Sequence, residues 1–343
     1  MGGGMLSRVA ERIYWTARYL DRIENTARLI DVYHKLMLDL PLGASFSWYG
    51  LITLNQSETL FKKSYKNEDE RSIIKFFLGD KQNPSSIISS LKQVRENIRT
   101  TRDTLPEFIW ILINEMSLFV EKNLHQGINR NQRIEFLDGI IHSCFQIKGL
   151  LLSTMPMSDA WYFMVIGRKI ERADMTTRLL YAGAKAHFQL EEQGPTINSH
   201  QLVWGNILQT LGALQAYRKA TRYAVVSEKV VHYLLEDPYL PSSISHCIHA
   251  IHTSCDHLPK KKPVIDLIES VEKNLFRSMN YRKLEEPFRE YLHRLQLQIA
   301  KIHQGISDNW FPQYENDKYD NDKHNNRKSE NKKHTHEQLK SNG

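Results

Sequence analysis

The chain has 343 residues, of which 41% are hydrophobic and 25% charged, and 46 Lys and Arg against 39 Asp and Glu give a formal net charge of +7. This composition is typical of a soluble globular protein long enough for two domains, and no apolar run approaches the roughly 18 residues of a membrane span. The three cysteines, Cys144, Cys247 and Cys255, lack CxxC spacing, which excludes a disulfide framework or a zinc ribbon and predicts a reducing, cytoplasmic location.

Helical periodicity runs along nearly the whole chain. No stretch of four or more residues alternates cleanly between apolar and polar, so the fold is predicted to be all-α. Asn83-Pro84 is interpreted as a helix cap followed by proline at the first helical position. The expected helices are residues 6–40, 46–65, 69–79, 84–104, 106–124, 130–154, 158–192, 198–224, 226–236, 241–257, 263–278 and 283–310.

The end of the chain differs from the rest in composition. Residues 313–343 are mostly Asn, Lys, Asp and His and contain almost nothing to bury, so they are predicted to form a disordered polar tail. Because the tail holds seven Lys and Arg against six Asp and Glu, the basic excess belongs to the folded part.

Two matches within the sequence indicate an internal duplication. Residues 18–30 align with residues 168–180 at an offset of 150, with Arg, Arg, Thr, Arg and Leu identical. A second pair of segments, FLGDKQNPSSI and LLEDPYLPSSI, aligns at an offset of 157. The chain is therefore predicted to consist of two helical bundles in tandem, residues 1–154 and 155–312.

Each repeat carries a charged face on one long helix. At about 100° per residue the charged and amide side chains of each segment share one arc, with an acid at its border. The first set is Arg18, Asp21, Arg22, Asn25 and Arg28, with Glu24 at the border. The second set is Arg168, Glu171, Arg172 and Arg178, with Asp174 at the border. Apolar residues precede and follow both sets along the arc, which favours packed faces over solvated ones.

Charges in such a setting must be paired, because an isolated buried ion costs several kcal/mol. We therefore expect acids of one repeat to meet arginines of the other, and arginine suits planar, bidentate pairing with carboxylates. Over both segments, seven basic residues, Lys169 included, stand against four acidic ones, which leaves room for an anionic ligand. A purely structural network and a ligand site both remain open.

The motifs at these positions resemble the bacterial alpha-E domain family, over roughly residues 5–311. They are MLSRVAERIYWTARYLDRIENTARLIDVYHKLML, NPSSI, RENIRTTRD and IGRKIERADMTTRLL. The resemblance implies an all-helical unit with a recurring Glu-Arg motif, typically in tandem. It also implies a role in peptide synthesis or modification beside ATP-grasp ligase-like proteins, transglutaminase-like proteins and a peptidase of the N-terminal-nucleophile type, which would carry the catalysis.

The family's motif carries over onto particular residues. Glu171-Arg172 is intact, whereas the first repeat has Asp21-Arg22, one methylene shorter. Residues Glu24-Asn25 and Arg28 match the ENxAR pattern of the first repeat. A further arginine-rich motif comprises Arg95, Glu96, Asn97 and Arg102. The second repeat lacks this last motif, so the two repeats are not expected to have the same function.

The stretch that aligns with this motif in the second repeat, residues 246–257, is rich in histidine. Projection on a helix places Ile244, Ile248, Ile251, Cys255 and Leu258 on the core side and spreads the histidines over the outer face. Histidines that drift around a helix do not converge on one ion. No metal and no cofactor is therefore predicted.

Three functions follow as hypotheses. The first is a non-catalytic helical subunit or scaffold whose arginine-rich groove between the repeats holds an acidic peptide or a partner. The second is an enzyme of amide-bond chemistry, in which arginine clamps a carboxylate and Glu24 or Asp174 acts as a base. The third is nucleic-acid binding, which the interior position of the basic excess disfavours.

Overall fold

The computed structural model describes residues 7–39, 47–193, 199–222, 224–275 and 284–312, and within these ranges every regular element is a helix. The all-α prediction is confirmed, while the predicted disordered tail lies outside the described residues. The helices are α1 (Ser7–Asp39), α2 (Gly50–Leu54), α3 (Glu58–Ser64), α4 (Glu70–Leu78), α5 (Ile87–Arg99), α6 (Phe108–Ile128), α7 (Arg133–Thr154), α8 (Asp159–Gln193), α9 (Ser199–Thr210), α10 (Leu214–Thr221), α11 (Ser227–Glu236), α12 (Ile244–Asp256), α13 (Lys262–Leu275) and α14 (Glu286–Trp310).

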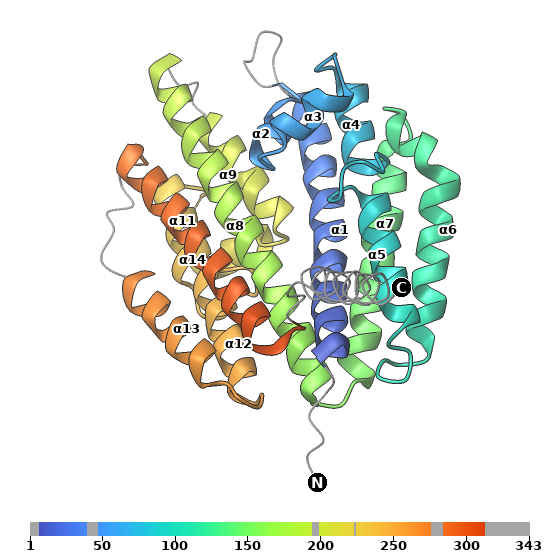
Figure 1. Cartoon of the computed structure of the whole chain (residues 1–343). Coiled ribbons are helices and arrows are strands. Elements are labelled where there is room, and N and C mark those ends of the chain that lie inside the picture. Colours follow the sequence, from blue (N-terminus) through green and yellow to red (C-terminus); the bar gives the residue numbers. More distant parts are fainter. Residues whose placement is uncertain (1–6, 40–46, 194–198, 223, 276–283, 313–343) are drawn as a thin grey trace, which may run out of the picture.

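The two longest helices, α1 and α8, lie side by side at the centre of the molecule (Figure 1). α5 and α7 pack on α1, and α6 covers α5 and α7; on the other side α12 and α14 pack on α8, and α13 covers α12 and α14. One continuous hydrophobic core includes residues of both halves. The packing partners of α1 and of α8 follow a similar order. The division into two repeats, residues 1–154 and 155–312, stays a prediction.

A glycine permits the close approach of the central helices. A Cβ atom on Gly167 of α8 would lie 2.3 Å from the carbonyl oxygen of Tyr14 on α1. The oxygen belongs to the backbone and the position of a Cβ is fixed by the backbone, so neither atom can rotate away. The contact brings the buried side chains of Leu20 and Ile23 on α1 into the same core as Ile170 on α8.

Two predicted helices are interrupted by residues with positive φ. The expected helix 46–65 divides into α2 and α3 at Gln56, whose φ is 52°. The expected helix 198–224 divides into α9 and α10 at Gly212, whose φ is 65°. A right-handed helix cannot continue through such a residue.

The SSI motifs place the starts of α5 and α12. The side chain of Ser86 accepts a hydrogen bond from the Ser89 amide, and the side chain of Ser243 accepts one from the His246 amide. The helix start predicted at Pro84 is therefore wrong by three residues, because serine takes the N-cap position.

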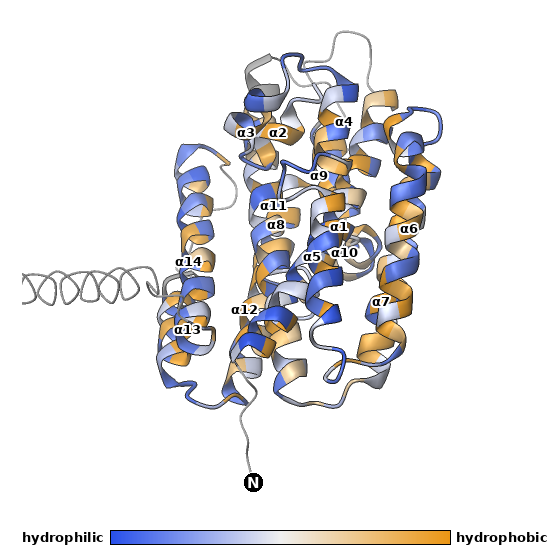
Figure 2. Ribbon diagram, turned by 45° about the vertical axis from the view of Figure 1, so that its right-hand side comes forward, coloured by the Kyte–Doolittle hydropathy of each residue, from blue (hydrophilic) through white to orange (hydrophobic). Residues whose placement is uncertain are grey.

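None of the helices in the described part of the chain is both long and apolar enough to cross a membrane. Hydrophobic residues instead run along α6 and α7 and gather on the sides of the helices that face one another (Figure 2).

Candidate functional site

The predicted charged faces of α1 and α8 meet each other near the middle of these helices. We call this cluster the charged band. Its members are Arg18, Asp21, Arg22, Glu24 and Arg28 of α1 with Arg168, Glu171, Arg172, Asp174 and Arg178 of α8. The carboxylates of Asp21 and Glu171 are almost fully buried, at 0% and 5% exposed. The band therefore lies inside the protein.

Glu171 is the centre of one half of the charged band. Its Oε2 accepts a hydrogen bond from Arg18 Nε at 2.9 Å, and Arg22 donates to both oxygens, from Nε at 2.6 Å and from Nη2 at 2.9 Å. Burial acts to raise the pKa of Glu171, but attraction to Arg22 and Arg18 outweighs it and lowers the pKa. Glu171 is therefore ionised, and its hydrogen bonds with Arg18 and Arg22 link α8 to α1.

Asp21 is the centre of the other half. Its Oδ2 accepts a hydrogen bond from Arg172 Nε at 3.2 Å, and its Oδ1 accepts one from Lys148 of α7. Lys148 Nζ also donates to Glu24 Oε2 at 2.5 Å, and Arg28 Nε donates to the other oxygen of Glu24 at 2.7 Å. Burial opposes ionisation of Asp21, but Arg172 and Lys148 outweigh it and lower the pKa to about 2.

Arg168 differs from its counterpart Arg18 in having no partner for its buried Nε atom among the described residues. Both oxygens of Asp21 are taken by Lys148 and Arg172, and Asp21 is one methylene shorter than Glu171. Burial lowers the pKa of Arg168, and the attraction of Asp21 does not make up for it. On this side the charged band therefore holds a guanidinium with one buried donor atom unpaired.

Two of the carboxylates pair within their own helix. Arg178 Nε donates to Asp174 Oδ2 at 2.8 Å, four residues away on α8, and Gln296 Nε2 of α14 donates to Asp174 Oδ1 at 3.3 Å. Glu24 and Arg28 form the equivalent pair on α1. The expectation that acids of one repeat meet arginines of the other thus applies to Asp21 and Glu171, and is wrong for Glu24 and Asp174.

The remaining predicted site residues lie elsewhere or make no polar contact. Arg95 Nε of α5 donates to Asn114 at 3.1 Å, and Glu96 pairs with Arg99 at 2.7 Å. The Arg102 guanidinium stacks 4.0 Å from the ring of Trp110, and the Asn97 carbonyl accepts the Thr101 hydroxyl at 2.9 Å. Asn25 is buried with its Nδ2 unpaired among the described residues. The structure therefore does not bring Arg95, Glu96, Asn97 and Arg102 into the charged band.

Sequence reasoning missed Lys148. It lies on the same face of α7 as the buried residues Cys144 and Leu151, four residues after the first and three before the second. A lysine on an otherwise apolar stripe was the available signal, because a buried lysine needs a carboxylate partner.

It also missed a second buried cation, Arg133 at the start of α7. Arg133 is 1% exposed, and its Nη1 contacts Glu70 Oε1 at 2.6 Å and His34 Nδ1 at 2.9 Å, while its Nε donates to the Gly127 carbonyl at 2.9 Å. These contacts join α1, α4 and the end of α6 to the start of α7. We interpret Arg133 as a structural residue.

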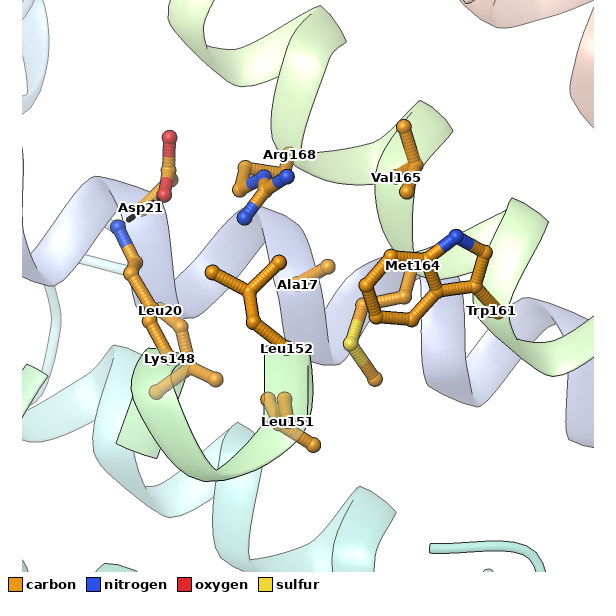
Figure 3. Close-up of a pocket in the computed structure, with 10 residues that line it drawn as sticks. All are labelled: Ala17, Leu20, Asp21, Lys148, Leu151, Leu152, Trp161, Met164, Val165 and Arg168. Atoms are coloured by element: carbon orange, nitrogen blue, oxygen red, sulfur yellow. Dashed lines mark hydrogen bonds and ion pairs between the residues drawn. The ribbon is translucent and has the colours of Figure 1, made fainter. Parts of the chain in front are cut away.

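A groove borders the charged band on each side. The α1–α14 groove has a volume of about 320 Å³ and is lined by Arg18, Asp174, Arg178 and His303 among others. The α7–α8 groove is smaller, about 20 Å³, and is shown in Figure 3, where Lys148, Leu151 and Leu152 of α7 face Trp161, Met164 and Arg168 of α8. Both grooves combine cations with apolar walls.

The histidine-rich face and the cysteines offer no obvious reactive centre. Ile244, Ile248 and Ile251 of α12 are buried as predicted. Within the ranges that the structure describes, no group of three or more His, Cys, Asp or Glu side chains is placed to hold a metal ion. The three cysteines are buried free thiols, and burial raises the pKa of each.

Acid should weaken the charged band. The pKa of Asp21 in the folded protein, about 2, lies below its ordinary value near 3.9, so its ionisation stabilises the fold above about pH 4 and this contribution disappears as the pH falls toward 2. We expect a loss of about 2 kcal/mol from Asp21 alone, measured by urea unfolding at a series of pH values between 6 and 2.5. The Asp21→Asn variant should show a smaller decrease over the same range; an equal decrease would contradict the assignment.

Comparison with known proteins places these features in a family. A family model named Alpha-E, described as a predicted alpha-helical domain with a conserved ER motif, matches residues 5–311. Uncharacterised proteins of Mycobacterium bovis and Mycobacterium tuberculosis are 25% identical to this chain over 197 residues. The match covers 51% of this chain and 22% of each of those proteins. No solved structure matches the chain.

Proposed function

Because this chain belongs to the Alpha-E family of helical proteins with a conserved ER motif, we propose that it is a non-catalytic helical subunit of a peptide synthesis or modification system. In this proposal the charged band holds an acidic group of a peptide or of a partner protein. ATP-grasp ligase-like and transglutaminase-like proteins are the partners proposed, and they carry the catalysis.

The observation that carries the proposal is the state of the carboxylates. Burial acts to raise the pKa values of Asp21, Glu24 and Glu171. Their arginine or lysine partners outweigh burial, so the pKa of each carboxyl is lowered. A general acid or base works best with a pKa near the working pH. These carboxylates stay ionised and paired, so they are suited to hold arginines in place and not to transfer protons.

The excess of cations supports binding as well. The six arginines of the charged band and Lys148 make seven cations against four carboxylates. The remaining basic residue of the two segments, Lys169, donates instead to the Pro241 carbonyl at 3.0 Å. Arg168 keeps a buried Nε without a partner among the described residues. A carboxylate from outside would supply the missing charge and hydrogen-bond acceptor. Because these cations lie largely inside the protein, they favour one acidic ligand over a nucleic-acid backbone.

The length of the relatives supports a role beside other polypeptide segments. The matched region accounts for 22% of each mycobacterial protein, so most of each of those chains lies outside the match. A helical unit that works against further domains fits this arrangement. We also propose a cytoplasmic location, since a reducing compartment suits three buried free thiols.

The test combines the purified full chain with purified ATP-grasp ligase-like and transglutaminase-like proteins from the same organism. We expect association by analytical ultracentrifugation and no acyl-transfer or peptidase activity from the chain alone. Failure to associate with either class of partner would overturn the proposal. So would an activity of the chain alone that Arg172→Ala abolishes without changing the unfolding midpoint, because that result identifies an enzyme.

A further inference from the structure

The two grooves beside the charged band differ in their electrostatics. In the α1–α14 groove, Arg18 is paired with Glu171 and Arg178 is paired with Asp174. Burial and the neighbouring Arg18 lower the pKa of His303 to about 4, so this imidazole is neutral at physiological pH. Each arginine of this groove already has its carboxylate.

The α7–α8 groove keeps positive charge to spare. Lys148, Arg168 and Asp21 line this groove. Beyond its lining, Arg28 and Arg172 complete a set of four cations around only two carboxylates, Asp21 and Glu24. Arg168 is the cation without a partner for its Nε. Figure 3 shows Arg168 near the joined pair Lys148 and Asp21, with Trp161 and Met164 at the other end of the groove. An anionic ligand is therefore favoured on this side.

Apolar side chains are exposed in the same groove and beside it on α7. Leu152, which lines the groove, is 52% exposed, and Phe145, which lies outside its lining, is 46% exposed. Seven residues separate them, so both lie on one face of α7 with Lys148 between them, about 10 Å apart at the helical rise. The Arg28 guanidinium lies 5.1 Å from the Phe145 ring. The groove thus presents two apolar contacts, two helical turns apart, beside a row of cations.

We propose that the α7–α8 groove binds an acidic amphipathic helix of a partner protein. This rests on the proposed function and names the occupant of the charged band. The apolar face of the incoming helix packs on Phe145 and Leu152, which are two turns apart on α7, and on Trp161 of α8. Glutamates beside that face reach Arg168 and Arg28. Two parallel walls of helix and an apolar stripe with a period of two turns are the features of helix-in-groove recognition.

The probes are three fluorescein-labelled peptides of 18 residues, stapled so that each is helical. The first has a leucine stripe flanked by glutamates, the second replaces every glutamate with lysine, and the third keeps the glutamates but replaces every leucine with alanine. Binding to the full chain is measured by fluorescence anisotropy. We expect the acidic amphipathic peptide to bind at least tenfold more tightly than either of the others.

Matched variants locate the site. Arg168→Gln and Phe145→Ser should each raise the Kd of the acidic amphipathic peptide about tenfold. Arg99→Gln and Leu118→Ser are controls, because Arg99 on α5 is an arginine outside the groove and Leu118 on α6 is exposed to a similar degree as Phe145. Arg168→Gln should fold normally, since it removes an arginine whose Nε has no partner and leaves no carboxylate without its own; its unfolding midpoint is measured alongside.

Each outcome supports or overturns either the acidic helix as the ligand or the α7–α8 groove as its site. Equal binding of the alanine peptide overturns the helix proposal but leaves the proposed function standing, since an acidic group alone is then recognised. Binding of the lysine peptide, or the same loss in the control variants as in the groove variants, overturns the groove as the site. If no peptide binds, this inference is wrong, whereas the proposed function is judged separately by association with the purified partner proteins.

Discussion

Replacing Glu171 with glutamine is expected to cost the protein about 3–5 kcal/mol of its free energy of unfolding. Glu171 is 5% exposed and is the shared partner of Arg18 and Arg22. Without its charge, two guanidinium groups remain buried between α1 and α8 with no counterion on that side. Glutamine keeps the size of the side chain, so the loss reports charge and not packing. Urea unfolding followed by circular dichroism measures it.

The control is Glu96→Gln on α5. Glu96 also pairs with an arginine, Arg99, at 2.7 Å, but the two side chains are 55% and 58% exposed. Exposed pairs contribute little, so the change should stay within about 0.5 kcal/mol. A Glu171→Gln variant as stable as Glu96→Gln would mean that the charged band is solvated, and the buried network would have to be abandoned.

Replacing Gly167 with alanine is expected to destabilise the protein by roughly 3 kcal/mol. The added Cβ would lie 2.3 Å from the Tyr14 carbonyl oxygen, so α1 and α8 must move apart along their whole contact. Such a movement also stretches the hydrogen bonds between Arg18, Arg22 and Glu171. The thermal unfolding midpoint should therefore fall clearly below that of the unaltered protein.

Gly149→Ala provides the opposite result at a matched position. Gly149 is a helical glycine on α7, and a Cβ there meets nothing within 4 Å. Alanine is the better helix former by up to about 1 kcal/mol, so this variant should be as stable as the unaltered protein or more stable. Two alanine variants with the same midpoint would contradict the close contact of the central helices.

The period of a helix depends only on residues that are near one another in the sequence. For this reason the all-α fold and the members of each charged face could be predicted from the sequence. Arg18, Asp21 and Arg22 share an arc whatever surrounds them, and Glu24 with Arg28 is a four-residue pair that any helix allows. The apolar stripe of α12, including Ile248 and Ile251, was found in the same way.

Features that depend on the packing of distant segments were not accessible. Lys148 donates a hydrogen bond to Asp21, which is 127 positions away in the sequence. The residues next to Lys148 in the sequence do not indicate which carboxylate it pairs with. The break at Gln56 requires a positive φ that glutamine does not favour by itself. Arg95 and Arg102 belong to a shared motif, but a motif gives no distance, and the structure places both outside the charged band.

The central claim is that the charged band binds through arginines held by permanently ionised carboxylates. The most direct measurement is a pH titration of the side-chain carboxyl carbons of Asp21 and Glu171 by 13C NMR on selectively labelled protein. We expect a pKa of about 2 for Asp21 and a pKa below the ordinary glutamate value for Glu171. If either carboxyl titrated between about pH 6 and 8, the range of a general acid or base, the carboxylates would not be permanently ionised and the enzyme hypothesis would replace the binding role.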